Sequence, residues 1–531
     1  MSGSTVITLL REHAEKHPGA RFATCADATY TYGELDRRTD RLAAGLQQLG
    51  VARGDRVAVL SPNRAEVLEL FFALPKTGAV QVPLNAYLKG DFLCHQLTDS
   101  QADVVVVDRP GLAAVRGVAD SLPGLRAVVC LDGPDNADDP GDALPLTAYR
   151  RLAVDAEPEP VELTASDLMS VVYTSGTTGF AKGCMLSHGY YTRVGQVMAD
   201  AVDMAEGDVL YTALPMFHGA ARMMVLTAGL VHGLPVVIEP AFSASTFLSR
   251  AADVGATIAF GVGAMGMALL AQPPAPADVE HQLRTFVLIP FPPERQREFT
   301  ERFRAEAWAE LYGQTECVPI TWNPIAGARE PASCGRAGSD LTVAILDDED
   351  RPVPPGVVGE ICLRPHGPQT MFSGYWNNAE ATVRATTSLW YHTGDYGRSD
   401  VDGHIYFVDR KKDAVRRRGE NVSTLEVEAA IVAHPAVAEA AVHAVPAATE
   451  DEIKVCIVAT GDVRPTPAEL FDYFREKLPY YAMPRYVEIV DDLPKNAVGR
   501  VMKFQLRERA LSDDVWDFEQ LGLTVDRLQR R

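Results

Sequence analysis

The 531-residue sequence lacks the features that mark several broad classes of protein. No apolar run reaches the roughly 18 residues that a membrane-spanning helix needs, which predicts a protein without a membrane span. The eight cysteines include no Cys-x-x-Cys pair, and such scattered usage in a long chain is typical of reduced thiols rather than of a disulfide framework or a zinc site. The first residues carry no basic stretch before an apolar one, so we expect them to form the first helix of a cytoplasmic protein rather than a secretory signal.

Basic residues are scarce relative to acidic ones. The chain carries 50 Lys and Arg against 71 Asp and Glu, which gives a net charge of -21 at pH 7. Such a surface repels phosphates and argues against nucleic acid as a partner. At 47% hydrophobic residues the chain can bury a large core. Its length suggests roughly three domains, or a large α/β enzyme in two.

Short apolar runs alternate with amphipathic stretches over most of the chain. Runs such as Arg56–Ser61, Asp103–Val107 and Met169–Thr174 are typical of buried strands. The stretches Ala65–Leu74 and Ser187–Val202 have the periodicity of helices. Strands that alternate with helices form parallel sheets covered by helices. We therefore predict an α/β fold with a large N-terminal domain of helix-covered sheets.

The pattern changes near residue 340. Short strands with Pro/Gly turns between them indicate a small β-rich subdomain over about 340–410, with strands at Leu341–Asp347, Gly359–Arg364 and His404–Val408. A compact α+β unit follows, in which Ser423 and Glu426 form an S-x-x-E capping box at the start of a helix. We predict an N-terminal domain over 1–410 and a small, mobile α+β C-terminal domain over 411–531.

The strongest local signal is the segment Tyr173-Thr-Ser-Gly-Thr-Thr-Gly-Phe-Ala-Lys-Gly183. Its glycines let backbone N–H groups turn toward an anion, its hydroxyls add donors, and its lysine adds a positive charge. The Gly-Lys-Ser/Thr ending of a Walker A loop is missing. We predict a triphosphate-binding loop made of Thr174, Ser175, Gly176, Thr177, Thr178, Gly179 and Lys182.

This loop resembles the phosphate loop of the adenylate-forming superfamily, which includes acyl-CoA synthetases, adenylation domains and luciferases. Four further motifs of that superfamily occur in the same order: Tyr312-Gly-Gln-Thr-Glu316, Tyr391-His-Thr-Gly-Asp395, Asp409-Arg-Lys-Lys-Asp413 and Leu493-Pro-Lys-Asn-Ala-Val-Gly-Arg500. The segment Met371-Phe-Ser-Gly-Tyr-Trp most resembles the carnitine/crotonobetaine-CoA ligase-like branch. The resemblance implies ATP and Mg²⁺ as cofactors, a small-molecule acid as substrate and CoA as acceptor.

The resemblance also assigns roles in nucleotide binding. It implies that Glu316 ligates Mg²⁺, that Thr315 contacts phosphate, and that Tyr312, beside Gly313, packs on adenine. From residue type alone, a solvated surface acid is the alternative for Glu316. The resemblance implies that Asp395 binds the ribose hydroxyls. From residue type alone, an aspartate that caps a turn would be the better interpretation.

Six basic side chains fall within residues 410–418 of this acidic chain. The resemblance implies that Arg410 contacts the phosphate and ribose of ATP. It places Lys412 at a hinge about which the C-terminal domain rotates between two half-reactions. For Arg416, Arg417 and Arg418 we leave two alternatives open, which are plain solvation and contact with CoA phosphates.

The acyl pocket is predicted from dispersed segments. The resemblance places His218, next to Phe217, at the carboxylate end of the pocket, although a lone histidine is more often a packed core residue. Arg222 falls in an apolar helix predicted over Ala221–Val231, where it either reaches solvent or binds a polar group of the substrate. The pocket prediction also includes Gly263, Ile289 and Phe291.

The sequence departs from the superfamily pattern at three places. Arg500 stands where a catalytic lysine is usual, and a planar guanidinium is not equivalent to an ammonium group. Leu288-Ile-Pro-Phe-Pro292 replaces a Gly/Ala-rich turn, so Ile289 and Phe291 would fill space that glycine leaves open. Ala181 replaces a proline in the phosphate loop. These departures suggest a pocket of unusual shape and an altered course of reaction.

We therefore expect an ATP-dependent carboxylate:CoA ligase that works through an acyl-AMP intermediate, with Lys182, Thr315, Glu316, His218 and Arg500 as catalytic residues. The alternative is an adenylate-forming enzyme with another acceptor or acid, such as one that forms amides or that activates nitrite to diazotise an aromatic amine. A non-catalytic nucleotide-binding protein is the third hypothesis. Neither the acid nor the oligomeric state follows from the sequence.

Overall fold

The computed structural model describes residues 3–133, 144–174, 181–327, 329–411, 415–417, 420–422, 424–446, 451–461, 464–478, 482–495, 501–509, 511–512 and 514–524. The chain divides into two compact units, of which the first comprises Met1–Val343 and Leu363–Trp390 and the second comprises Ala344–Cys362 and Tyr391–Arg531. This division splits the predicted β-rich subdomain, with residues 344–362 and 391–410 in the second unit and residues 340–343 and 363–390 in the first. The predicted boundary at 410 and 411 concerns a hinge and stays a prediction.

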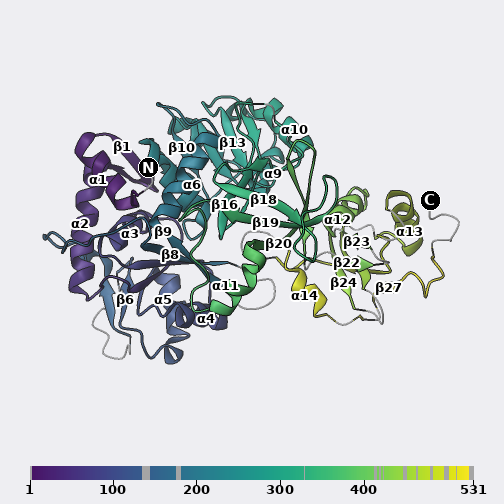
Figure 1. Ribbon diagram of the computed structural model, residues 1–531, viewed down its shortest axis with the longest axis horizontal. Coiled ribbons are helices and arrows are strands. Elements are labelled where there is room, and N and C mark those ends of the chain that lie inside the picture. Colours follow the sequence, from purple (N-terminus) through teal and green to yellow (C-terminus); the bar gives the residue numbers. More distant parts are fainter. Residues whose placement is uncertain are drawn as a thin grey trace. The chain divides into compact units, whose positions relative to one another are not determined.

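Two seven-stranded sheets form the first unit (Figure 1). The strands of one sheet, in spatial order, are β14 (Glu306–Trp308), β13 (Thr285–Leu288), β12 (Ile258–Gly261), β10 (Leu210–Thr212), β11 (Val236–Ile238), β1 (Arg21–Cys25) and β2 (Ala28–Thr31). The strands of the other are β7 (Leu146–Ala148), β6 (Ala127–Cys130), β5 (Val104–Val107), β3 (Arg56–Leu60), β4 (Val80–Leu84), β8 (Leu168–Thr174) and β9 (Lys182–Ser187). Only β2 and β9 run antiparallel to their neighbours, so the predicted parallel sheets are confirmed.

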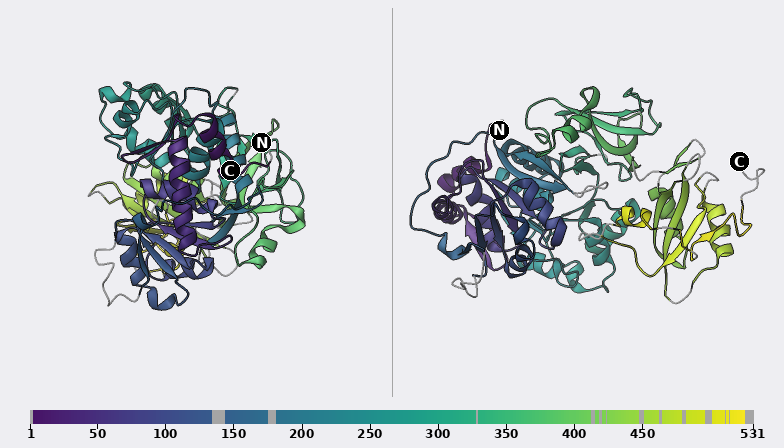
Figure 2. Two further views of the ribbon diagram at one scale, coloured as in Figure 1. Left: turned by 90° about the vertical axis from the view of Figure 1, so that its left-hand side faces the viewer. Right: turned by 90° about the horizontal axis from the view of Figure 1, so that it is seen from below.

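Helices lie between and around these sheets. The helices of the first unit are α1 (Val6–Lys16), α2 (Tyr32–Gln48), α3 (Ala65–Lys76), α4 (Gly90–Ser100), α5 (Arg109–Arg116), α6 (His188–Ala201), α7 (Ala228–His232), α8 (Phe247–Asp253), α9 (Gly263–Leu270), α10 (Pro293–Phe303) and α11 (Ala379–Ala385). Helices α1 and α2 pack against each other (Figure 2), and α3 contacts β1 of one sheet and β4 of the other. Because both faces of the parallel strands are covered, strands such as β5 consist entirely of buried valines.

One predicted helix differs in its geometry. The stretch predicted as a helix over Ala221–Val231 begins as a π-helix, η3 (Ala220–Thr227), and continues as α7. The Thr227 hydroxyl donates to the carbonyl of Arg222 at 2.8 Å, five residues earlier. Periodicity predicts that a helix exists here, but it does not separate the wide π-turn from the ordinary α-turn.

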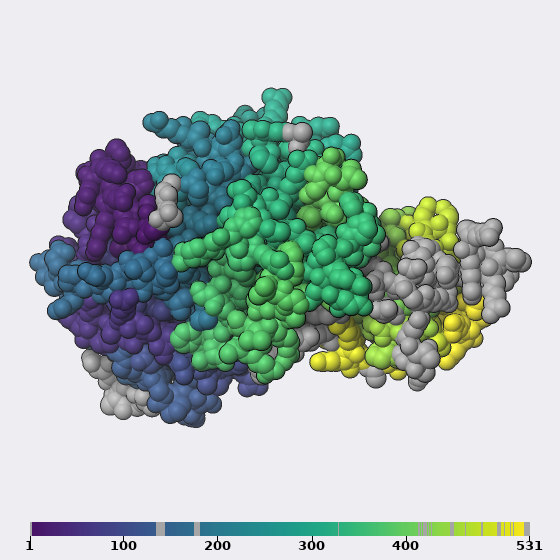
Figure 3. Space-filling model, viewed as in Figure 1, coloured from purple at the N-terminus to yellow at the C-terminus, as the bar shows by residue number. Residues whose placement is uncertain are grey.

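The remaining short elements of the first unit include a three-stranded antiparallel sheet of β15 (Leu311–Gln314), β16 (Cys317–Trp322) and β17 (Arg336–Ala337). Short 3-10 turns occur at Ala119–Ser121, Tyr149–Arg151, Pro276–Asp278 and Thr387–Leu389. Helix α11 has no buried residue and lies on the face seen in Figure 3. Every helix among the described residues is too short or too polar to cross a bilayer.

The second unit contains two four-stranded sheets and a two-stranded ribbon. One sheet has the order β18 (Leu341–Leu346), β19 (Gly359–Pro365), β20 (Tyr391–Ser399) and β21 (Ile405–Arg410). The other has the order β24 (Val437–Val445), β25 (Glu452–Ala459), β26 (Tyr486–Val490) and β27 (Trp516–Asp517). The ribbon pairs β22 (Val415–Arg417) with β23 (Glu420–Val422), and the helices are α12 (Thr424–Val432), α13 (Pro467–Lys477) and α14 (Lys503–Arg507). The predicted α+β character is confirmed.

A buried carboxylate joins β21 to α12. Asp409 is 2% exposed and accepts hydrogen bonds from the backbone N–H and the hydroxyl of Thr424, at 2.6 and 2.7 Å. Two donors therefore hold this charge at the start of α12. The predicted capping box cannot be compared, because Ser423 and the side chain of Glu426 lie outside the described residues.

Helix α2 passes so close to a neighbouring turn that only glycine fits at Gly45. A Cβ atom there would lie 1.9 Å from the carbonyl oxygen of Leu152. Gly45→Ala should lower the thermal midpoint despite the better helix propensity of alanine, because overpacking costs about 1–3 kcal/mol or more. Gly117→Ala is the matched control, since its Cβ would come no closer than 3.4 Å to any atom. Equal midpoints for the two variants in calorimetry would contradict the close approach.

Candidate nucleotide and acyl site

Strands β8 and β9 hold the two ends of the predicted phosphate loop. They pair antiparallel, with Thr174 opposite Lys182. The loop residues Ser175, Gly176, Thr177, Thr178 and Gly179 lie outside the described residues. Lys182 is exposed and lies directly opposite Thr174, the residue at which β8 enters the loop.

The predicted Mg²⁺ ligand sits at the tip of a tight hairpin. Gln314 pairs with Cys317 across β15 and β16, which leaves Thr315 and Glu316 as the two turn residues. The carboxylate is only 8% exposed, so the alternative of a solvated surface acid is wrong. The backbone carbonyl of Thr315 accepts from the Tyr190 hydroxyl at 3.1 Å, which fixes the turn.

Glycine is required immediately before this turn. A Cβ atom at Gly313 would lie 2.8 Å from Val318 and 3.0 Å from the Cys317 carbonyl. The side chain of Tyr312 is 8% exposed and belongs to the same strand. Tyr312, Gly313, Thr315 and Glu316 therefore belong to one hairpin, which brings together the residues of the predicted nucleotide-binding motif.

The segment Phe372–Trp376 connects this hairpin to the phosphate loop. Its backbone bonds to β9 through Met185 and Gly183, and the Phe372 N–H donates to the Glu316 carbonyl at 2.7 Å. The Tyr375 hydroxyl donates to Oε1 of Glu316 at 2.7 Å. The ammonium group of Lys182 lies 4.9 Å from the centre of the Tyr375 ring. One tyrosine thus bonds the predicted metal ligand and contacts the predicted phosphate-binding lysine, a role that sequence reasoning missed although it had singled out the segment.

The residues present fit a hard cation. Mg²⁺ in nucleotide enzymes takes one or two carboxylates and completes its shell with phosphate oxygens and water. Glu316 offers one buried carboxylate of this kind, held at one oxygen by Tyr375. Among the described residues, three or more metal-ligating side chains gather only at Glu360, Cys362 and His392 in the second unit. There the ammonium of Lys411 already lies 3.1 Å from Glu360.

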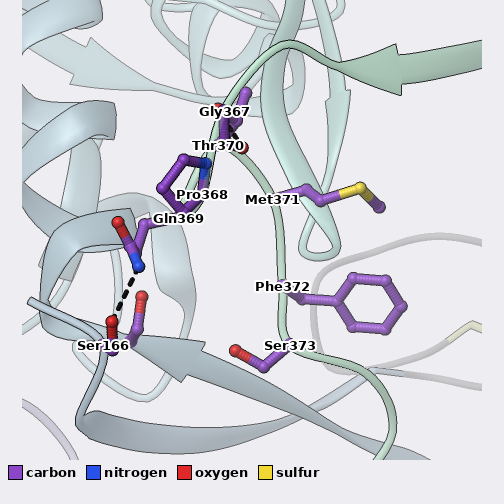
Figure 4. A pocket seen from close by; sticks show the side chains of 9 residues that line it. Ser166, Gly367, Pro368, Gln369, Thr370, Met371, Phe372 and Ser373 are labelled. Atoms are coloured by element: carbon purple, nitrogen blue, oxygen red, sulfur yellow. Dashed lines mark hydrogen bonds between the residues drawn. The ribbon is translucent and has the colours of Figure 1, made fainter.

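A cavity of about 290 Å³ borders the same connecting segment (Figure 4). It is lined by Ser166, Ser187 and Gly367–Ser373. Gln369 reaches toward Ser166 and donates to its hydroxyl at 2.9 Å. Of the predicted site residues, none lines this cavity.

The predicted carboxylate-binding histidine follows a loop that is held by a buried asparagine. Asn63 is 6% exposed, donates to the carbonyls of Leu214 and Glu239 at 2.9 Å each, and accepts from the Met216 N–H at 2.7 Å. Asparagine suits this position because its amide can donate twice and accept at once. The sequence contains no spacing that links Asn63 to this loop.

His218 itself lacks a hydrogen-bond partner among the described residues at its buried Nε2 atom. Burial lowers the pKa of His218 below its usual value of 6.5, so the ring is neutral at neutral pH. Its ring centre lies 4.8 Å from that of Phe217. The structure therefore presents a neutral, largely buried imidazole whose Nε2 atom makes no hydrogen bond among the described residues.

Arg222 does not reach solvent. Its side chain is 2% exposed, its Nη2 donates to Oε1 of Gln81, and its guanidinium lies 4.8 Å from the centre of the Phe71 ring. The solvated alternative is therefore wrong. Neither Gln81 nor Phe71 was singled out in the sequence.

Gly263, Ile289 and Phe291 come together at the start of α9. A Cβ atom at Gly263 would lie 1.9 Å from the carbonyl oxygen of Pro290. Phe291 is buried and packs against Phe299 of α10 at 5.9 Å, whereas Ile289 is partly exposed. Phe291 thus belongs to the core beneath α9, and its role in an acyl pocket stays a prediction.

In the second unit, Asp395 and Arg410 are cross-strand partners on β20 and β21. Asp395 is 4% exposed, and Nε of Arg410 lies 3.8 Å from its carboxylate. Gly394 adopts φ +71° before it, a left-handed conformation that favours glycine. The two residues predicted to bind ribose and phosphate therefore lie side by side.

The basic run that follows is only partly described. Lys412 and Arg418 lie outside the described residues, as does the side chain of Arg416. Arg417 is 4% exposed, forms an ion pair with Glu452 at 2.6 Å and donates to the Met483 carbonyl. For Arg417 both alternatives, solvation and a contact with CoA phosphates, are therefore wrong, because its guanidinium is paired with Glu452 inside the second unit.

Arg500 also lies outside the described residues, but the base of its loop does not. Lys495 and Val501 form a bridge across it. On one side Lys495 pairs with Glu439 at 2.7 Å, and on the other Lys503 pairs with Glu428 at 2.7 Å. Two ion pairs therefore anchor the ends of the predicted catalytic loop.

Removal of the Tyr375 hydroxyl tests the connection between Lys182 and Glu316. Tyr375→Phe keeps the ring but leaves a buried carboxylate without its donor, which should destabilise the first unit by about 1–3 kcal/mol. The control is Tyr406→Phe, whose hydroxyl bonds the more exposed Asp400 at 3.1 Å. We expect a lower thermal midpoint for Tyr375→Phe than for the control, and the reverse order would contradict a structural role for the bond.

Comparison with known proteins agrees with this geometry. The family model for AMP-binding enzymes matches residues 10–376, and the model for their C-terminal domain matches residues 426–500. The chain is 32% identical over 482 residues to a crotonobetaine/carnitine–CoA ligase of Salmonella paratyphi A, covering 90% of this chain and 93% of the relative. It is 34% identical over 501 residues to a feruloyl-CoA synthase of Amycolatopsis sp., covering 93% and 97%.

Solved structures give the same result. ATP-bound MatB from Rhodopseudomonas palustris superposes with a TM-score of 0.84 at 28% identity, over 95% of this chain and 99% of that one. An anthranilate CoA ligase in complex with anthranoyl-AMP superposes with a TM-score of 0.83 at 26% identity, over 95% and 96%. The chain therefore belongs to the AMP-binding enzyme family, the adenylate-forming enzymes that its motifs predicted.

Proposed function

We propose that the protein is an ATP-dependent, AMP-forming acid:CoA ligase. The observation that carries the proposal is the hairpin of Glu316 joined through Tyr375 to Lys182 at the mouth of the phosphate loop. Phosphoryl and adenylyl transfer depend on charge neutralisation and on in-line positioning of the reactants. Tyr375 contacts both a buried carboxylate, which suits a cation, and a lysine, which suits a phosphate. This arrangement supplies charge neutralisation and a fixed position for the reactants.

In the first half-reaction, an oxygen of the substrate carboxylate attacks the α-phosphorus of ATP, and pyrophosphate leaves with its bond electrons. Lys182 and the loop donors neutralise the phosphate oxygens, and the neutral imidazole of His218 donates or accepts a hydrogen bond at the acid. Mg²⁺, when bound at Glu316, would screen the charge of the phosphates. Asp395 and Arg410 are proposed to hold the ribose and phosphate, as the motif resemblance implies.

In the second half-reaction, the thiol sulfur of CoA attacks the carbonyl carbon of the acyl-AMP, and AMP leaves. The hinge prediction at Lys412 assigns this step to a second position of the C-terminal domain. Relatives named as CoA ligases support CoA as the acceptor. The identity of the acid does not follow from their names, which differ from one relative to the next.

Pyrophosphate release tests the proposal directly. The protein should release pyrophosphate from ATP when given its acid, and it should form a thioester of the corresponding mass only when CoA is added. A screen over aliphatic and aromatic acids, each with and without CoA, measures both steps. Pyrophosphate release from ATP, nitrite and an arylamine without any need for CoA would favour the diazotising alternative, and no release from any acid would favour a non-catalytic protein.

Removal of the two charges joined by Tyr375 should impair the first half-reaction. Lys182→Met and Glu316→Gln are each expected to lower kcat/KM for pyrophosphate release by about 100-fold or more. For Glu316→Gln, the Mg²⁺ concentration that gives half-maximal activity should also rise. Lys89→Met and Glu330→Gln are the matched controls at positions outside the site. An unchanged Mg²⁺ dependence in Glu316→Gln would show that Glu316 does not ligate Mg²⁺.

Two substitutions of Arg500 distinguish the effect of its charge on catalysis from the effect of its shape. Arg500→Lys should retain pyrophosphate release to within about tenfold, whereas Arg500→Met should lose about 100-fold, because a cation near the reacting oxygens stabilises the transition state. Thioester formation from supplied acyl-AMP should be less affected in both variants. Full pyrophosphate release by Arg500→Met would show that another cation performs this task.

A further inference from the structure

The described part of the chain buries four basic side chains almost completely, and three of them have an acidic partner. Their exposed fractions are 3% for Lys76, 2% for Arg222, 4% for Arg417 and 1% for Lys454. Lys76 pairs with Asp36 at 2.6 Å, Arg417 pairs with Glu452 at 2.6 Å, and Lys454 pairs with Glu488 at 2.7 Å. Arg222 forms no ion pair with any acid among the described residues.

The immediate surroundings of Arg222 do not replace the missing charge. Its Nη2 donates to the carboxamide oxygen of Gln81, and its guanidinium stacks over the ring of Phe71. Its Nε–H is buried and has no acceptor among the described residues. Gln81 is itself fixed, because its amide nitrogen donates to the Phe71 carbonyl at 2.9 Å. A neutral amide and an aromatic face leave a buried cation under-compensated.

Arg222 lies in η3, four residues after His218, the residue predicted to meet the substrate carboxylate and the last but one before the helix begins. Both side chains carry a buried nitrogen without a partner among the described residues, Nε2 in His218 and Nε in Arg222. The turn between them opens the π-helix η3. Such wide turns frequently occur at functional sites. Two unpartnered nitrogens, one just before η3 and one within it, therefore indicate a ligand with polar groups at two places.

We propose that Arg222 selects an acid that carries a second carboxylate group. The inference rests on the proposed ligase function, in which the first carboxylate is activated at His218. A carboxylate supplies both missing elements, since it brings a negative charge and an acceptor for the Nε–H. A monocarboxylic acid of the same length would leave the guanidinium uncompensated, so the pocket would reject it.

Matched pairs of acids test the selection. Linear and aromatic dicarboxylic acids are compared with acids of equal length in which one carboxylate is replaced by a methyl group or a carboxamide, by kcat/KM for pyrophosphate release. We expect a preference of at least about 100-fold for one or more dicarboxylates. In Arg222→Met this ratio should fall toward one, mainly through loss of the dicarboxylate. A ratio that Arg222→Met leaves unchanged would overturn the proposal.

Gln81→Glu provides a second variant that keeps Arg222. The new carboxylate stands where the amide oxygen now accepts from the guanidinium, so it should compensate the charge from within the protein. We expect the thermal midpoint to rise and the preference for the second carboxylate to disappear, with monocarboxylates now accepted. A Gln81→Glu protein that is stable and still prefers the dicarboxylates would contradict the proposal.

Arg302→Met is the control for truncation of a partly buried arginine that has an acidic partner. Its guanidinium also lies 4.8 Å from the centre of a phenylalanine ring, that of Phe303, but it pairs with Asp278 at 2.9 Å. This variant should lower the thermal midpoint without changing the ratio between the two classes of acid. If Arg222 had a purely structural role, Arg222→Met would likewise lower the thermal midpoint without changing the ratio. The ratio therefore distinguishes a structural role from selection of the acid.

Calorimetric titration of the dicarboxylates without ATP keeps the two proposals apart. If no acid supports pyrophosphate release, the ligase proposal fails, but binding of a dicarboxylate to the unaltered protein and its loss in Arg222→Met would still support the Arg222 site. Pyrophosphate release from monocarboxylates alone would support the ligase and overturn the selection by Arg222. Absence of both release and binding would overturn both.

Discussion

The hydrogen bond from Tyr375 to Glu316 is the contact on which the arrangement of the candidate nucleotide site depends. It joins residues that are 59 positions apart and sets a buried carboxylate at the tip of a hairpin. The same tyrosine ring lies beneath the ammonium group of Lys182, and its backbone pairs with Cys184 of β9. Because the backbone on either side of Tyr375 is hydrogen-bonded to β9, the distance between the lysine and the carboxylate is set by the fold rather than by two flexible side chains.

A second constraint is that the charges buried in the fold must be compensated, because an uncompensated buried charge destabilises a protein. The chain meets it with fixed donors and ion pairs. Asp409 receives two bonds from Thr424, and Arg417 is neutralised by Glu452. Burial also raises the pKa of the Cys184 thiol, next to Glu316, so this cysteine stays uncharged beside the carboxylate. Against this background Arg222 stands out, because it is the one almost completely buried Lys or Arg side chain among the described residues that has no acidic partner.

The sequence predicted the fold well because local periodicity and long-range topology agree. Strands such as β3, β5 and β8 are short, mostly apolar runs, and helices such as α3 and α6 are longer stretches rich in apolar residues between them. The motifs singled out Glu316, Asp395 and Arg410 as site residues, but the hairpin that carries Glu316 and the cross-strand pairing of Asp395 with Arg410 emerge only from the structure. Residues that act across distance were missed. Asn63 meets Met216 over 153 positions and Gln81 meets Arg222 over 141, and no spacing in a single sequence links such pairs.

Arg500, at the position where a lysine is usual, belongs to a loop whose two ends are held in place. The ends of its loop are fixed by the bridge between Lys495 and Val501 and by ion pairs to Glu439 and Glu428, none of which involves residue 500 itself. The contacts at the two ends of the loop therefore do not depend on which residue stands at position 500. A guanidinium can hold two oxygens at once, whereas an ammonium group acts as a point charge. Under the proposed function, arginine at position 500 keeps the positive charge of the usual lysine and changes the geometry with which that charge meets oxygen atoms.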